Sequence, residues 1–206
     1  DFFRMAADGG ISEAQYLMGC LYAEGKVLVR DYPKAILYYR GSSGQGKPEA
    51  QCNLGFMFFC GLGLTKNLRE AIKYYSLAAN QKHALAQYNL ANMYFLGVGL
   101  KRDSSKALLL YSRAADDGCQ DAQNVLGLIY FTGHIVPSNY SLALRHLKRA
   151  ADGGHMWAQY NLGVMYSSLP GLYRNRSLAL FYYRRAAGQG HEQARMAVRL
   201  LEKHRD

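Results

Sequence analysis

Three histidines and one cysteine recur at a 36-residue interval and are the residues of this chain best suited to binding a metal ion. They are His83, Cys119, His155 and His191. A metal site needs its ligands about 2 Å from one ion. Equivalent residues of neighbouring repeats lie on the order of 10 Å apart when their helices pack side by side, so these side chains cannot share an ion. We therefore predict no metal site and expect the histidines to be structural or solvated.

Other arrangements that carry chemistry are incomplete. The segments 61–63 and 97–99 read Gly-Leu-Gly and Gly-Val-Gly, without the third glycine and the preceding strand of a dinucleotide-binding loop. The 206 residues include only 15 acidic ones, and no Ser-His-Asp order, Cys–His pair or converging carboxylates can be argued from them. We predict no enzyme activity and no cofactor, and a hydrolase is the least favoured function.

Two ladders of alanines repeat every 36 residues and show that the chain is a repeat array. One comprises Ala14, Ala50, Ala86, Ala122, Ala158 and Ala194, and the other Ala35, Ala71, Ala107, Ala143 and Ala179. A unit repeated at a fixed interval stacks on its neighbours and forms an extended surface rather than an enclosed active site.

Each unit contains two predicted helices and no predicted strand. Apolar residues of the first helix are spaced i, i+4, i+7 and i+8, as in segment 86–94, and lie on one helical face. A small residue directly after the leucine of the first helix, such as Gly55 or Gly163, lets the second helix approach closely. The second helix follows a glycine-containing turn and begins at an N-capping Asp or Asn, namely Asp31, Asn67, Asp103, Asn139 and Asn175. These patterns predict an all-α fold, an α-solenoid of stacked helix-turn-helix repeats wound as a right-handed superhelix.

The unit resembles the Sel-1-like repeat, a relative of the tetratricopeptide repeat that reads roughly A-x-x-x-L-G-x-x-Y-x-x-G, then A, Y-Y and A-A. Segments 158–166 and 179–187 read AQYNLGVMY and ALFYYRRAA. The resemblance covers almost the whole chain and is specific for the fold rather than for the function. One departure is Leu169, where other units have glycine, followed by Pro170 and Gly171, so we expect a different path for the fifth turn.

The repeat boundaries predict a single array. Residues 1–13 would end a truncated repeat, 14–49, 50–85, 86–121, 122–157 and 158–193 would be full repeats, and 194–206 a C-terminal capping helix. The chain starts with Asp, and segment 1–10 resembles the end of a second helix, so we expect a fragment of a longer protein. No apolar run is long enough to cross a bilayer, and no signal-like segment opens the chain.

The compartment stays open between the cytoplasm and the lumen of the endoplasmic reticulum. Four cysteines, Cys20, Cys52, Cys60 and Cys119, occupy unrelated repeat positions, which favours free thiols and is compatible with a reducing compartment. Two glycosylation sequons begin at Asn139 and Asn175, which fits a lumen, although both asparagines also occupy the N-cap position. The resembled family includes adaptors of endoplasmic-reticulum quality control, cytosolic regulators and secreted bacterial proteins.

A net charge of +10 makes RNA, an anionic membrane or an acidic protein conceivable partners. Clustered basic residues lie on the second helices, which form the outer, convex side in tetratricopeptide-like packing: Lys73, Arg113, Arg145, Lys148, Arg149, Arg184 and Arg185. The aromatic residues are spaced like core residues and are not interleaved with arginine as in nucleic-acid platforms. Binding of RNA or anionic membrane by this face is the alternative function.

The favoured site is the concave groove that first-helix side chains would line. Phe59, Phe95 and Phe131 recur there at one unit's spacing, and they would form either an exposed apolar ladder or a packed layer between units. Cys52 shares a predicted groove position with Tyr16 and Tyr88. The predicted partner-binding residues are Phe59, Tyr88, Asn92, Phe95, Asn124, Leu128, Phe131, Trp157 and Tyr160.

We therefore predict a protein-interaction scaffold or adaptor that holds a protein or peptide segment in its aromatic groove, as part of a larger complex. Trp157, on the rim, belongs to a residue type favoured in binding hot spots. The repeated glutamines 15, 51, 87, 123 and 159 are open to two interpretations, because their amides can bond the link backbone or the main chain of a bound peptide. Pairing of arrays through their ends is also left open.

Overall fold

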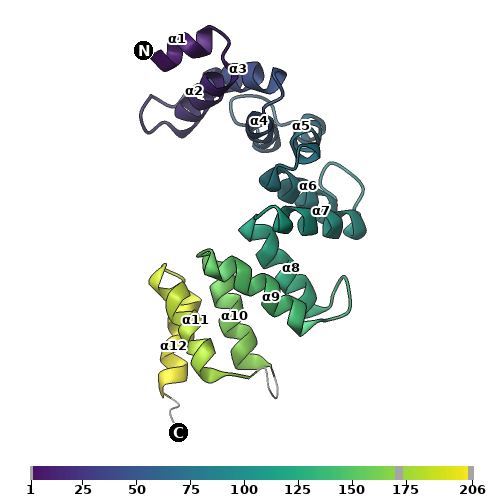
Figure 1. Ribbon diagram of the computed structural model, residues 1–206, viewed down its shortest axis with the longest axis vertical. Coiled ribbons are helices and arrows are strands. Elements are labelled where there is room, and N and C mark those ends of the chain that lie inside the picture. Colours follow the sequence, from purple (N-terminus) through teal and green to yellow (C-terminus); the bar gives the residue numbers. More distant parts are fainter. Residues whose placement is uncertain (1, 170–173, 204–206) are drawn as a thin grey trace. The chain divides into compact units, whose positions relative to one another are not determined.

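The computed structural model describes residues 2–169 and 174–203, which are α-helical and contain no strand (Figure 1). Their helices are α1 (Phe2–Asp8), α2 (Ser12–Glu24), α3 (Tyr32–Gly44), α4 (Pro48–Cys60), α5 (Leu68–Asn80), α6 (Ala84–Leu96), α7 (Ser104–Asp116), α8 (Gln120–Thr132), α9 (Tyr140–Asp152), α10 (Met156–Ser168), α11 (Arg176–Gly188) and α12 (Glu192–Lys203). The predicted fold class, an all-α solenoid of helix-turn-helix repeats, is confirmed.

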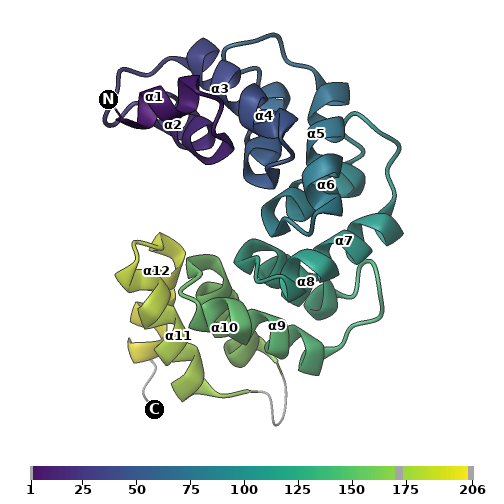
Figure 2. The same cartoon turned by 45° about the horizontal axis from the view of Figure 1, so that its top comes forward.

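The chain divides into two compact units. Unit 1 is Asp1–Asp117 and unit 2 is Gly118–Asp206. In unit 1 the hairpins α2–α3, α4–α5 and α6–α7 follow one another, and each second helix packs against the next first helix (Figure 1). Unit 2 repeats this order with α8–α9 and α10–α11, and α12 packs against α11 (Figure 2). Each hairpin therefore completes its core with its neighbour, as a solenoid requires.

Both alanine ladders lie in the core. Ala14 is 5% exposed, and the other ladder alanines are completely buried. Because a longer side chain at these positions would push neighbouring helices apart, the alanines set the short distance between them. Larger buried residues such as Leu54 and Tyr75 in unit 1 and Leu147 and Leu162 in unit 2 fill the remaining space.

Close contact within a hairpin depends on the small residue of its first helix. A Cβ added at Gly55 would lie 2.7 Å from Cδ1 of Tyr75, and one added at Gly163 would lie 2.5 Å from Cδ1 of Tyr183. Both distances are far below van der Waals contact, so the tyrosine rings rest directly on the helix backbone at these glycines. The role predicted for the small residues is confirmed.

The helix ends match their sequence signals. The first helices α2, α4, α6 and α8 end at left-handed glycines, Gly25, Gly61, Gly97 and Gly133, with φ between +69° and +76°. The second helices begin at the predicted Asp and Asn caps. Oδ1 of Asn139 accepts the Leu142 N–H at 3.0 Å, and Oδ1 of Asn175 accepts the Leu178 N–H at 2.9 Å. Both sequon asparagines thus have a structural role.

Helix α10 ends differently from the other first helices. Its C-cap is Leu169, which is buried and extended, with φ −74° and ψ 143°, where the others have a left-handed glycine. The predicted change of path starts at this residue, and Pro170 and Gly171 lie outside the described residues.

Candidate functional site

The histidines considered as metal ligands cap helices instead. Nδ1 of His83, His155 and His191 accepts the N–H of the residue three positions later, at 3.2, 3.1 and 3.2 Å respectively. Each therefore satisfies one of the backbone N–H groups left unpaired at a helix start. In residues 2–169 and 174–203, no three His, Cys, Asp or Glu side chains gather in a way that could hold a metal ion.

The repeated glutamines bond to the protein itself. Nε2 of Gln159 donates to the Ala151 carbonyl at 3.1 Å, and its Oε1 accepts from Nε2 of Gln189 at 2.8 Å. Gln15 bonds in the same way to the Ala7 carbonyl and to Gln45. The carbonyls that they bond belong to the last turn of the preceding helix, and the glutamines that bond them are the C-caps of α3 and α11, so these amides tie consecutive hairpins together.

The basic side chains of the second helices lie on solvated faces. Lys73, Arg113, Arg145, Lys148, Arg149 and Arg184 are exposed, and Arg185 is half-buried. Some of them are engaged locally: Lys73 pairs with Glu70 at 3.2 Å, Arg184 with Glu202 at 2.6 Å, and Arg185 donates to the Ala151 carbonyl at 3.3 Å. These contacts are ordinary for an outer helix face and select neither RNA nor anionic lipid.

The three repeated phenylalanines, Phe59, Phe95 and Phe131, are half-buried. They form neither a fully exposed ladder nor a fully packed layer between units. Phe95 packs edge-on against Tyr111, with ring centres 6.5 Å apart, and Phe131 lies 6.2 Å from Tyr140. In each case the partner is on the second helix of the same hairpin. Phe59 also packs on its own hairpin core, and its accessible side lines a pocket. One side of each ring therefore belongs to the core.

The two other predicted site residues of unit 1, Tyr88 and Asn92, lie on α6 beside Tyr111. Oδ1 of Asn92 accepts the Tyr111 hydroxyl at 2.6 Å, and the ring of Tyr88 is 6.0 Å from that of Tyr111. Both are partly accessible. Cys52, predicted on the same face, is only 2% exposed, and that prediction is wrong because its small side chain packs into the core cluster with Tyr75.

The predicted site residues of unit 2 form two groups on α8 and α10. On α8, Asn124 accepts a hydrogen bond from Asn161 at 2.9 Å, and Leu128 is half-buried. On α10, the Tyr160 ring stacks on His191 with centres 4.3 Å apart.

Trp157 meets the same histidine edge-on at 4.5 Å and is 52% exposed. The structure thus brings Trp157 and Tyr160 together around the buried His191.

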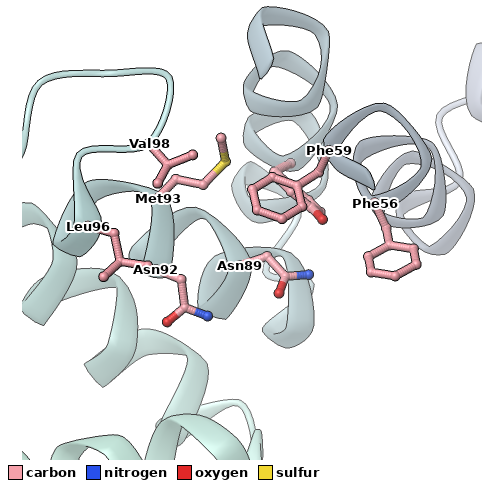
Figure 3. A pocket seen from close by; sticks show the side chains of 8 residues that line it. Phe56, Phe59, Asn89, Asn92, Met93, Leu96 and Val98 are labelled. Carbon is pink, nitrogen blue, oxygen red and sulfur yellow. The ribbon is translucent and has the colours of Figure 1, made fainter. Parts of the chain in front are cut away.

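A pocket of about 120 Å³ opens between α4, α5 and α6 in unit 1, and we call it the α4–α6 pocket. Its lining comprises Phe56, Phe59, Tyr75, Asn89, Asn92, Met93, Leu96 and Val98. Figure 3 shows Phe59, Met93 and Val98 on one side and the amides of Asn89 and Asn92 on the other. An apolar cavity of about 150 Å³ holds a benzene molecule. The α4–α6 pocket is smaller, at about 120 Å³, and has room for one aliphatic side chain.

The α4–α6 pocket is electrically neutral. None of its lining side chains is acidic or basic. Burial raises the pKa of the Tyr75 hydroxyl, and it raises the pKa of the nearby Cys52 thiol to about 12. Both groups are therefore uncharged near neutral pH, and Cys52 is a poor nucleophile. The pocket is suited to binding an apolar group rather than to acid–base or nucleophilic chemistry.

A second cleft of about 410 Å³ lies one repeat earlier, between α2, α3 and α4. Its lining is more polar and includes Tyr16, Glu24, Tyr39 and Asn53. Phe56, which is 49% exposed, lines both cavities and stands between them. Unit 1 therefore carries two adjacent binding-sized cavities on its first-helix face.

Sequence reasoning placed Phe59 and Asn92 at this surface but missed three of their neighbours, Asn89, Met93 and Val98. Asparagine recurs at 53, 89 and 161, one position of the repeat, and this recurrence was a usable signal. Met93 belongs to the apolar stripe of segment 86–94, which predicts a core residue, and it is buried apart from its contact with the pocket. Val98 comes from the turn, whose path no helical periodicity describes.

The Sel1 repeat profile matches five consecutive segments of the chain, 12–46, 48–83, 84–119, 120–155 and 158–191. The chain belongs to the Sel1 repeat family. Proteins built from Sel1 repeats generally act as protein-interaction scaffolds, and the Sel1 solenoid is typically not catalytic. The family assignment predicted from the repeat unit is confirmed. A comparison with curated proteins finds no match.

Solved Sel1 structures resemble this chain over nearly its full length. The protective antigen c5321 of uropathogenic Escherichia coli is 32% identical, with a TM-score of 0.81 over 95% of this chain and 42% of its own. A Sel1 repeat protein from Oxalobacter formigenes is 31% identical, with a TM-score of 0.82 over 92% of this chain and 75% of its own. The Sel1 array described here thus spans less than half of the Escherichia coli antigen.

A putative Sel1 repeat protein from Klebsiella pneumoniae, 19% identical with a TM-score of 0.62, shares the fold. None of the helices in the described part of this Sel1 chain combines the length and the apolar character needed to span a bilayer.

Proposed function

We propose that this Sel1 array is a protein-interaction scaffold whose α4–α6 pocket holds an apolar side chain of a partner segment. The observation that carries the proposal is the pocket itself, a neutral cavity of about 120 Å³ with apolar walls and two amides at its edge. Such a combination is typical of sites that take up one anchor residue and orient the chain around it.

The two kinds of lining would contribute differently. Burying one leucine-sized side chain contributes about 1.5–3 kcal/mol from the apolar area removed from water. The amides of Asn89 and Asn92 would bond the main chain of the partner. Oδ1 of Asn92 already accepts a hydrogen bond from the Tyr111 hydroxyl, so the side-chain N–H groups of Asn92 would be the donors to a carbonyl of the partner.

The other predicted site residues extend this proposal without being needed for it. Tyr88 and Phe95 lie on the same helix as Asn92 and would contact the partner beyond the pocket. In unit 2 we propose a separate contact region, formed by Asn124, Leu128, Phe131, Trp157 and Tyr160.

A random twelve-residue peptide display library tests the α4–α6 pocket. The 206-residue chain is compared with a Phe56→Ser/Leu96→Ser variant, whose two side chains line the pocket and are 49% and 66% exposed. Leu77→Ser/Leu109→Ser is the matched control, because both leucines are exposed apolar residues on the second helices α5 and α7. All three proteins should keep the same helical circular dichroism signal.

We expect the wild type and the control to enrich the same peptides, each with a large apolar residue, and the pocket variant to lose that enrichment. Binding of an enriched peptide should weaken about tenfold or more in the pocket variant, the equivalent of losing one buried side chain. Equal enrichment by all three proteins would rule out the pocket as the binding site.

A further inference from the structure

Three cations of unit 1 recur at the same position of the repeat, directly before the residue that caps the second helix. They are Arg30, Lys66 and Arg102, and all three are exposed. Each stands over an aromatic ring: Arg30 is 5.9 Å from the ring centre of Tyr32, Lys66 is 5.7 Å from Phe59, and Arg102 is 5.7 Å from Phe95. Phe59 and Phe95 lie on the first helices α4 and α6, so their rings hold Lys66 and Arg102 beside the first-helix face, whereas Tyr32 lies on α3.

The loop geometry keeps these cations in equivalent places. A Cβ added at Gly61 would lie 3.2 Å from Cβ of Lys66, and one added at Gly97 would lie 3.2 Å from Cβ of Arg102. The next residue is anchored in both loops, because the Asn67 N–H donates to the Phe58 carbonyl and the Asp103 N–H to the Tyr94 carbonyl, each at 2.9 Å. Both side chains therefore leave the backbone from a fixed point.

Lys66 and Arg102 belong to the two loops that adjoin the α4–α6 pocket. Phe59, the ring beneath Lys66, lines the pocket from α4. Arg102 leaves the loop that follows α6, and the same loop places Val98 in the pocket wall (Figure 3). Lys66 and Arg102 lie one repeat apart, in the loops that follow α4 and α6, and α5 packs against both of these helices.

These cations lack carboxylate partners, whereas their neighbours have them. Lys34 pairs with Asp31 at 3.0 Å and Lys106 with Asp103 at 3.6 Å. Among the described residues, neither Lys66 nor Arg102 takes part in an ion pair, and the pocket beside them contains no acidic side chain. The positive charges of Lys66 and Arg102, beside a neutral apolar pocket, can therefore pair with the carboxylates of a ligand.

We propose that the occupant of the α4–α6 pocket is an acidic peptide segment, with an apolar side chain in the pocket and carboxylates paired with Lys66 and Arg102. This inference rests on the proposed function. Lys66 belongs to the loop after α4 and Arg102 to the loop after α6, so an acidic residue would flank the apolar residue of the segment on each side. The overall charge of +10 would also attract such a segment.

The cleft between α2 and α4 is a poorer site for the same peptide. Arg30 stands there over Tyr32, which lines the cleft, but Glu24 lines it as well. The Glu24 carboxylate would repel an acidic segment, and its ion pair with Lys26 at 3.3 Å is exposed and weak. The acidic segment is therefore assigned to the α4–α6 pocket alone.

Charge reversal tests this assignment with the same peptide display library. A Lys66→Glu/Arg102→Glu variant is compared with the wild type and with Arg40→Glu/Lys82→Glu, which changes the net charge equally. Arg40 and Lys82 are exposed, belong to α3 and to the link before α6, and have no ion pair among the described residues. The best wild-type peptide is then synthesised with a fluorescent label, and its affinity is measured by anisotropy at low and at physiological salt.

We expect wild-type peptides to carry Asp or Glu on both sides of the apolar residue, and the reversed variant to select Lys or Arg instead. The affinity of the synthesised peptide should fall at least about tenfold in the reversed variant and less than about twofold in the control. If the reversed variant loses its helical signal, Lys66→Gln/Arg102→Gln replaces it and should weaken binding by about fivefold.

The failures are distinguishable. Apolar peptides without acidic flanks, or equal affinity in the reversed variant, would overturn the acidic assignment and leave the pocket proposal standing. Absence of any enrichment that depends on Phe56 and Leu96 would overturn both. Tighter binding of a ten-nucleotide polyuridine than of the acidic peptide, lost in the same reversed variant, would overturn the assignment in favour of RNA.

Discussion

Units 1 and 2 share one hairpin design but use their first-helix faces differently. In unit 1, Phe59 lines an open pocket and Lys66 stands over its ring. In unit 2, the half-buried ring of Tyr160 lies 5.7 Å from Tyr183, as its repeat equivalent Tyr88 lies 6.0 Å from Tyr111 in unit 1, and it stacks in addition on His191. The first-helix face of unit 1 therefore offers a pocket, whereas that of unit 2 offers the exposed Trp157 beside an aromatic stack.

The loops between the first and second helices also differ between the two units, in the residue that precedes the helix cap. The position of Lys66 and Arg102 is Ser138 in the first loop of unit 2, and Arg174 holds it after α10, where Leu169 replaces the capping glycine. The repeated backbone determines where a loop residue stands, and the residue type determines whether that place carries a charge. In such an array, the residues that differ between repeats therefore determine what each repeat can bind.

The largest expected effect is on stability, and it tests whether the two units unfold separately. Leu54 in unit 1 and Leu162 in unit 2 occupy the same repeat position and are completely buried. Each Leu→Ala change should lower the free energy of unfolding by about 2–5 kcal/mol, because it removes apolar contacts and leaves a cavity.

Hydrogen exchange followed by mass spectrometry locates the effect. Protection should fall mainly within the mutated unit, since repeats interact chiefly with their neighbours. A uniform loss of protection over the whole chain in both variants would break the distinction between the units.

A smaller difference is expected between two equivalent glutamines. Gln159 of unit 2 is satisfied at both ends of its amide, whereas Oε1 of Gln87 in unit 1 is buried with no hydrogen-bond partner in the described residues. Its Nε2 donates to Oδ2 of Asp117 at 3.2 Å and, over a longer 3.5 Å, to the Ala79 carbonyl. Replacing Gln159 by Met should cost about 1–3 kcal/mol, and the same change at Gln87 should cost less, because it also removes a buried oxygen that has no partner.

Urea unfolding of both variants measures this contrast. A cost at Gln87 equal to or above that at Gln159 would show that the unsatisfied oxygen does not weaken the link in unit 1.

The smallest expected effect concerns the cap of α6 in unit 1. Burial lowers the pKa of His83, whose neutral Nδ1 accepts the Ala86 N–H. Because the folded chain binds this proton more weakly than the unfolded chain, the contribution of His83 is present above its ordinary pKa of about 6.5 and is lost as the pH falls through the folded value.

We therefore expect Tm to decrease less between about pH 7.5 and about pH 5 in His83→Asn, because asparagine caps the helix without titrating in this range. Wild type and variant are compared by circular dichroism across this range. Parallel pH profiles would contradict a role for His83 protonation in the stability of unit 1.

Most of the fold was predictable because its signals are local and repeated. The spacing of alanines, the Asp and Asn caps and the glycine turns each act within a few residues, and five copies reinforce them. The candidate site was predictable only in part. Periodicity placed Phe59 and Asn92 on the accessible face, but it placed Cys52 there as well, and the packing buries that thiol.

The amino-acid sequence alone determined the helical hairpin, its repeat and the membership of the Sel1 family, because each depends on apolar spacing and on the chemistry of helix ends. Tertiary structure decided which repeated side chains remain accessible. The depth of the pocket between α4 and α6 depends on how two helices and a turn approach one another, and small differences in side-chain volume at their contacts open or fill such a space.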